Sequence, residues 1–81
     1  MAHRYEFRVE DVTCEKCEAR VRAALEELPG AQQIELLRTP QDEAVVVFEA
    51  NQAIEPQVIE RAIEQQSTGT THHYQVHWAK A

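Results

Sequence analysis

The spacing of apolar residues changes repeatedly along this chain, and these changes restrict the folds that it can adopt. Residues 4–10 alternate between charged and apolar side chains, which is the period of a β-strand with one buried face. Between residues 16 and 28 the apolar positions recur three and four residues apart, as on one face of a helix. Pro29 and Gly30 then predict the end of that helix.

The rest of the chain continues with patterns of the same kind. They predict a strand at 34–37, a turn at 39–42, a strand at 44–48, a helix from Pro56 to about Gln66, a loop at 67–71 and a strand at 73–78. The order is therefore β-α-β-β-α-β. Two helices that each bury one face predict an α+β fold in two layers, with an antiparallel four-stranded sheet and both helices on one side.

Size and charge limit the functions that such a chain can have. With 81 residues we expect one domain over 1–81, and no apolar run approaches the roughly 20 residues that span a bilayer. The first residues lack the apolar core of a secretory signal, so we expect a cytoplasmic protein. The net charge of −6 disfavours nucleic acids and anionic membranes as partners and favours a protein with a basic patch.

The most informative residues are Cys14 and Cys17, which lie between the first predicted strand and the first predicted helix. Cysteines this close in sequence cannot tie distant segments together, so in a reducing compartment they indicate metal binding or redox chemistry. The start of a helix carries unpaired N–H groups and partial positive charge, which favour thiolates. Lys16 adds positive charge, and Thr13 is predicted to be the N-cap. Two thiolates at this spacing can hold one soft metal ion.

The number of ligands favours Cu(I). Thiolates select Cu(I), zinc and related metals, but structural zinc normally has four ligands, whereas Cu(I) is satisfied by two or three sulfurs. An incomplete ligand set also suits a carrier, because the thiolate of an acceptor can enter before the first pair releases the ion. Two other functions stay open. One is a thiol–disulfide oxidoreductase, which the small size and the strand order disfavour, and the other is an interaction domain with incidental cysteines.

Residues 9–30, with the sequence VEDVTCEKCEARVRAALEELPG, resemble the metal loop and first helix of the heavy-metal-associated domain family, and residues 58–64 are similar to its second helix. That family includes cytosolic copper chaperones, N-terminal metal-binding domains of copper-transporting P-type ATPases, and mercury-binding proteins. The resemblance implies a ferredoxin-like fold with Cys14 and Cys17 as metal ligands. It also implies that the partner is a metal-transporting P-type ATPase or another metal acceptor protein.

The chain departs from the family's usual motif, Gly-Met-Thr-Cys-x-x-Cys, in ways that bear on the metal. Asp11 and Val12 stand where Gly and Met are usual, and Val12 is expected to take the packing role of that methionine. Thr13 matches copper-type members, since zinc-transporting relatives tend to carry an acidic residue there, and Asp11 does not substitute for it. The second departure is the loop at 66–72, which is longer than its counterpart in copper chaperones.

Histidines at the end of that loop are candidates for a third ligand. In the expected fold His72 and His73 lie at the same edge of the sheet as Cys14, and imidazole suits both copper and zinc. Ligation by both would produce a four-coordinate zinc site, although adjacent histidines in a loop are more commonly exposed polar residues. His3 and His77 are expected to face solvent.

These expectations combine into one interpretation. The chain is a soft-metal binding and delivery protein, a cytosolic Cu(I) chaperone that transfers its ion by thiolate exchange, with Zn(II), Hg(II) or Cd(II) as alternative cargo. Paired acids such as Glu26-Glu27 lack the partners that general acid–base catalysis needs, so no enzyme is expected. Met1 and a complete last strand favour a free protein over an excised transporter domain, present as a monomer or as a metal-bridged dimer.

Overall fold

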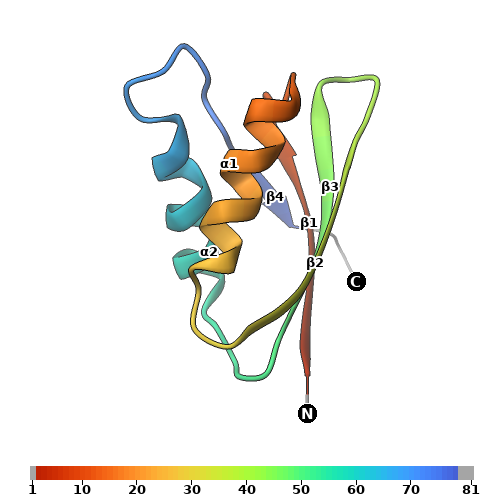
Figure 1. The fold of residues 1–81 in the computed structure, drawn as a ribbon, viewed down its shortest axis with the longest axis vertical. Coiled ribbons are helices and arrows are strands. Elements are labelled where there is room, and N and C mark those ends of the chain that lie inside the picture. The colour runs from red at the N-terminus through yellow and green to blue at the C-terminus, as the bar shows by residue number, and fades with distance from the viewer. Residues whose placement is uncertain (1, 79–81) are drawn as a thin grey trace.

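The computed structural model describes residues 2–78, in which two helices pack against one sheet (Figure 1). The elements follow one another as β1 (His3–Glu10), α1 (Glu15–Glu26), β2 (Ala31–Arg38), β3 (Glu43–Ala50), α2 (Pro56–Glu64), the short 3-10 helix η1 (Gln65–Ser67) and β4 (Val76–Trp78). This order confirms the predicted β-α-β-β-α-β arrangement and the ferredoxin-like class. Met1, on which the expectation of a free protein partly depends, lies outside the described residues.

The strand order in the sheet is β2-β3-β1-β4, and every neighbouring pair is antiparallel. The two helices lie side by side on one face of the sheet (Figure 1). Neither helix of the described part is long and apolar enough to cross a membrane. Because β1 and β3 run in opposite directions, the loop that follows β1 and the loop that follows β3 lie at opposite edges of the sheet.

The core lies between the helices and the sheet, and it follows the periodicities of the sequence. Strands contribute alternate residues and helices contribute one stripe each. The largest fully buried side chains are Tyr74, Phe7, Phe48, Leu25, Ile59, Ile63, Val9, Val12, Val21, Val46 and Cys17. Burial of one large apolar side chain stabilises the fold by roughly 1.5–3 kcal/mol. Because this set includes the Cys17 thiol and the Tyr74 phenol, the core extends to the edge of the sheet that carries the cysteines.

The strands differ in length from the predicted ones where backbone hydrogen bonds, and not side-chain spacing, decide their limits. β2 and β3 extend beyond the predicted 34–37 and 44–48, because their backbones continue to pair where the side chains are polar. β4 begins only at Val76. The N–H of the preceding His73 is bonded to the carboxylate of Asp11 at 2.8 Å instead of to a neighbouring strand.

Helix α1 begins at Glu15, and its N-cap is Cys14 in an extended conformation. The prediction that Thr13 is the N-cap is wrong, because the helical hydrogen bonds begin one residue later, with the N–H of Glu18 donating to the carbonyl of Cys14 at 3.1 Å. The side chain of Cys14 makes no capping hydrogen bond. Its sulfur is therefore not engaged in holding the start of the helix.

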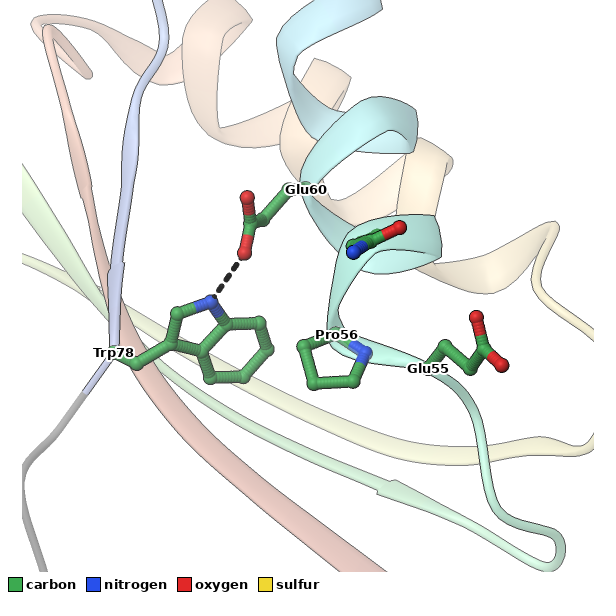
Figure 2. A pocket seen from close by; sticks show the side chains of 5 residues that line it. Glu55, Pro56, Glu60 and Trp78 are labelled. Carbon is green, nitrogen blue, oxygen red and sulfur yellow. Dashed lines mark hydrogen bonds between the residues drawn. The ribbon is translucent and has the colours of Figure 1, made fainter.

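A hollow opens between the first turn of α2 and β4, and Figure 2 shows the side chains that line it: Glu55, Pro56, Gln57, Glu60 and Trp78. The indole Nε1–H of Trp78 donates a hydrogen bond of 2.6 Å to the carboxylate of Glu60. The same indole packs against Phe7, with 5.0 Å between ring centres. Carboxylates, an amide, a proline and an indole are not the ligands that soft metals prefer. These contacts hold β4 to α2.

Candidate metal centre

Loops from three parts of the chain meet at the edge of the sheet that carries the cysteines (Figure 1). They are the β1–α1 loop, the β2–β3 turn and the long loop that follows η1. The N–H of Val12 donates to the carbonyl of Asp42 at 3.0 Å, which joins the first loop to the turn. The hydrogen bond from the N–H of His73 to Asp11 joins the first loop to the third. The surroundings of the cysteines are therefore fixed by contacts between segments that are distant in sequence.

The two thiols face each other across the first turn of α1. The Sγ atoms of Cys14 and Cys17 are 3.4 Å apart, and both cysteines are free. Cys14 is half-buried, whereas Cys17 is fully buried. One sulfur is thus accessible to an incoming group, and the other is anchored in the core.

The Cys17 thiol is acidic for a buried group. Burial raises its pKa, but hydrogen bonds from the Tyr74 hydroxyl, from the backbone of Thr13 and Cys14 and from the Cys14 thiol outweigh this effect and lower the pKa from 9.0 to about 6. A thiol with this pKa is mostly ionised at neutral pH. The sequence predicted an acidic thiol at the helix start, but it did not identify the phenol as a cause.

Tyr74 and Arg20 belong to the site, and the sequence interpretation missed both roles. Burial raises the pKa of Tyr74, and its hydrogen bond to Cys17 raises it further. Arg20 Nη1 donates to the Tyr74 hydroxyl at 3.5 Å, and this bond raises the pKa of Arg20. Arg20 follows Cys17 by three positions on α1, a spacing that places both on one helix face and could have identified it. Tyr74 carried no such signal, because the alternation of its segment indicated only an inward-facing residue.

His72 is the histidine that the structure brings to the sulfurs. Its Nε2 lies 3.7 Å from Cys17 Sγ, and its Nδ1 lies 3.5 Å from Asp11 Oδ2. The ring stacks on Tyr74 with 6.0 Å between ring centres and 18° between the planes. The expectation that this loop reaches the cysteine edge is therefore met by His72.

The other histidines lie outside this cluster. His73 is exposed, and the contact that it makes with the site is the bond from its backbone N–H to Asp11. His77 is exposed on β4, where its Nε2 lies 3.1 Å from the carboxylate of Glu10, and His3 is exposed at the start of β1. Their positions agree with the expectation that His3 and His77 face solvent.

Val12 and Thr13 pack the loop in different ways, while Lys16 is exposed. Val12 is fully buried, and the Thr13 hydroxyl oxygen lies 3.9 Å from Cys17 Sγ. Arg38 of β2 is a support that the sequence did not indicate. Its Nη1 donates to the Thr13 carbonyl at 3.2 Å, and its Nε donates to Glu18 at 2.7 Å. Arg38 thereby ties the metal loop and the first turn of α1 to the sheet.

Within residues 2–78, no three His, Cys, Asp or Glu side chains are already arranged as a metal site. The preassembled part is the sulfur pair, with His72 beside it. Two thiolates suit a soft metal ion, and a nearby imidazole is a ligand that copper and zinc both accept. The donor set therefore fits a soft metal and leaves room for a ligand from another molecule.

Comparison with known proteins gives a family and a fold. The family model of the heavy-metal-associated domain matches residues 6–70. No curated protein sequence matches the chain. Among solved structures, the chain is similar to the N-terminal domain of ZntA, which was determined in solution in the apo form. The match covers 100% of this chain and 97% of that domain, with 22% sequence identity and a TM-score of 0.75. At this identity the likeness is one of fold.

Proposed function

The chain belongs to the heavy-metal-associated domain family, and on that premise we propose that it binds one soft metal ion through Cys14 and Cys17 and delivers it to an acceptor protein. The observation that carries this proposal is the pair of free thiols 3.4 Å apart, one of them with a pKa of about 6. A thiolate is the form that binds a metal, so Cys17, which is mostly ionised at neutral pH, rarely has a proton to lose on loading. The metal is cargo, and no catalytic step is assigned to the chain.

Cu(I) is the cargo that the ligand count favours. Two thiolates with one further ligand satisfy Cu(I), and such a set leaves no structural four-ligand cage to dismantle on release. Thr13 before the first cysteine is the residue typical of copper-type members that the sequence resembles. Its hydroxyl lies near Cys17 without adding an anionic oxygen to the site.

Zn(II) is the second candidate, and His72 is the observation that favours it. With metal–sulfur bonds of about 2.3 Å, a tetrahedral ion needs sulfurs about 3.8 Å apart and a trigonal ion about 4.0 Å. The observed 3.4 Å lies below both values, so the sulfur pair can open slightly to hold either ion. His72 would then supply a third ligand, and water or a partner's side chain a fourth. Hg(II) and Cd(II) share the preference for thiolate.

Delivery follows from the unequal exposure of the two sulfurs. The half-buried Cys14 is the position at which an acceptor's thiolate can approach, while Cys17 keeps its bond to the ion. Each new metal–sulfur bond replaces an old one, so the ion moves without a change in oxidation state. The acceptor is a metal-transporting P-type ATPase or another metal acceptor protein, and the net charge of −6 suits a partner with a basic docking face. The proposed setting is the cytoplasm.

An anaerobic titration of the reduced protein against competing chelators tests this proposal. We expect one Cu(I) ion per chain, held tightly enough to compete with a strong Cu(I) chelator, and weaker binding of Zn(II). The variant Cys14→Ser/Cys17→Ser should bind neither metal, whereas His3→Ala, which changes a remote exposed histidine, should bind as the parent does. Tight one-to-one zinc binding without a preference for Cu(I) would overturn the choice of metal, and binding that survives loss of both cysteines would overturn the site.

A further inference from the structure

Asp11 has an unusual backbone for a residue with a side chain. Its φ is 66°, in the left-handed region, where an L-residue other than glycine is disfavoured by about 1 kcal/mol, with Asp and Asn the least affected. The motif that the chain resembles usually has glycine at this position, which adopts such a φ without cost. A residue with a carboxylate in a conformation suited to glycine indicates that the carboxylate itself has a role.

The carboxylate of Asp11 holds the loop that carries His72. Its Oδ2 accepts the N–H of His73 at 2.8 Å, and the same atom lies 3.5 Å from His72 Nδ1. Thr70 Oγ1 accepts the N–H of His72 at 3.1 Å, which fixes the loop from the other side. The ring of His72 is stacked on Tyr74. Position and plane of the imidazole are thus determined before any metal arrives.

The two nitrogens of His72 face different partners. Nδ1 faces the Asp11 carboxylate, and Nε2 faces Cys17 Sγ at 3.7 Å. In a neutral imidazole one nitrogen carries the proton and the other offers a lone pair. In the metal-free protein the Cys17 thiolate competes for this proton at Nε2. Once a metal ion neutralises the sulfurs, the carboxylate beside Nδ1 favours the proton there and leaves the lone pair of Nε2 for the ion. This is the arrangement by which a carboxylate orients a metal-binding histidine.

We propose that Asp11 is the positioning residue that makes His72 a third ligand of the sulfur site, by keeping its carboxylate beside Nδ1 and thereby directing Nε2 toward Cys14 and Cys17 when a metal ion binds. The inference rests on the proposed function and deepens it, because it gives the site a ligand set of two thiolates and one imidazole. Asp11 itself touches no metal. Its effect on metal binding passes entirely through His72.

The first experiment measures the tautomer without any metal. In Cys14→Ala/Cys17→Ala protein no thiolate competes for the ring proton, and nitrogen chemical shifts of His72 report the tautomer at a pH where the ring is neutral. We expect Nδ1–H with Asp11 present and Nε2–H, the form favoured in free histidine, in the added variant Asp11→Gly. The same tautomer in both proteins, or Nε2–H with Asp11 present, would overturn the proposal. This result does not depend on whether the protein carries a metal.

The second experiment is a double-mutant cycle on Zn(II) and Cu(I) affinity in the protein with both cysteines. Loss of a carboxylate that orients a ligating histidine costs about 10- to 100-fold in metal affinity, and we expect Asp11→Gly to fall in this range for Zn(II). In a His72→Ala background the same substitution should change the affinity less than twofold. Equal losses in both backgrounds would show that Asp11 acts on the loop in general, and they would overturn the proposal.

The chain offers a matched control for the backbone effect of glycine. Asp42, in the β2–β3 turn, also has a positive φ of 60°, and it contributes its backbone carbonyl to Val12. Asp42→Gly should leave both the tautomer and the metal affinity unchanged. Asp11→Asn keeps an acceptor oxygen and tolerates the left-handed backbone, so it should retain most of the affinity. If the parent binds neither metal, the proposed function fails, while the tautomer experiment still decides the role of Asp11.

Discussion

The two strand-to-helix junctions of this fold share a plan but lie at opposite edges of the sheet, and they differ in chemistry. In each, an extended residue without a side-chain capping bond precedes the helix, Cys14 before α1 and Glu55 before α2. At the first junction two thiols, an imidazole and a phenol approach one another. At the second, Pro56 starts the helix, and the hydrogen bond between Trp78 and Glu60 joins β4 to α2 (Figure 2).

The difference shows how a small domain separates binding from stability. Polar contacts from three loops hold the β1–α1 junction, and the groups that make these contacts include the proposed ligands. Proline, aromatic packing and one indole–carboxylate bond hold the β3–α2 junction. Substitutions at the first should therefore change metal affinity and thiol chemistry, whereas substitutions at the second should change the free energy of unfolding.

The largest effect is expected from Cys14→Ser/Cys17→Ser. Both sulfur ligands are lost, so Cu(I) affinity should fall by more than about 1000-fold in a chelator competition assay. The free energy of unfolding of the metal-free protein should fall by only about 1–2 kcal/mol, since a hydroxyl is buried in place of the Cys17 thiol. An unfolded double variant would contradict the separation, because it would make the cysteines part of what holds the fold.

Stability should depend on pH through Cys17. Its pKa in the folded chain is about 6, below the 9.0 of an ordinary thiol, so between these values the unfolded chain binds more protons and the free energy of unfolding rises with pH. The contribution is fully present above about pH 9 and is lost as the pH falls through 6. Urea unfolding of the reduced, metal-free protein should show the free energy of unfolding increasing by on the order of 3 kcal/mol between pH 6 and pH 9.

Cys17→Ser is the control for this pH dependence. The variant keeps the other titrating groups, so subtraction of its profile isolates the thiol. A parent and a variant with identical profiles between pH 6 and 9 would mean that the Cys17 thiol is not acidic in the folded chain.

At the opposite junction, Trp78→Phe should reduce stability without affecting the metal. The substitution removes the hydrogen bond to Glu60, which is worth about 1.5–3 kcal/mol when the acceptor is charged. Metal affinity should stay within about twofold of that of the parent, and the pKa of Cys17 should be unchanged. Glu60→Gln keeps an acceptor oxygen and should cost less. A tenfold loss of metal affinity in Trp78→Phe would break the proposed independence of the two edges.

Much of the fold could be predicted from the sequence, because periodicity records which side of a strand or helix is buried. The alternation at 4–10 and the helical spacing at 16–28 were sufficient for β1 and α1. The prediction failed where a contact between distant segments decides the local structure. β4 starts late because a carboxylate of the first loop takes the N–H of His73, and no local pattern contains that information.

The candidate site could be predicted only in part, as the fold could. The position of Cys14 and Cys17 at a helix start followed from the order of the elements, and the edge reached by His72 followed from the expected topology. The acidity of Cys17 depends on Tyr74, 57 positions along the chain, and the support of the loop depends on Arg38. Spacing along the sequence cannot show such pairs, since they arise only when three loops meet.

Two tyrosines, one near each junction, should give the smallest effects when they are replaced by phenylalanine. Tyr74→Phe removes the hydroxyl that lowers the pKa of Cys17, so this pKa should rise from about 6 by about one unit, as measured by the pH dependence of thiol alkylation. Tyr5→Phe is the matched control, because the Tyr5 hydroxyl accepts the N–H of Ile54 at 2.7 Å near the other junction. It should cost about 1 kcal/mol of stability and leave the Cys17 pKa unchanged.

X-ray absorption at the metal edge tests most directly whether the sulfur pair of Cys14 and Cys17 holds the metal. For protein loaded with one equivalent of Cu(I), we expect two sulfur neighbours from Cys14 and Cys17 and one nitrogen neighbour that disappears in His72→Ala. The sulfur contribution should be absent in Cys14→Ser/Cys17→Ser. A spectrum with only nitrogen and oxygen neighbours in the parent protein would contradict the account.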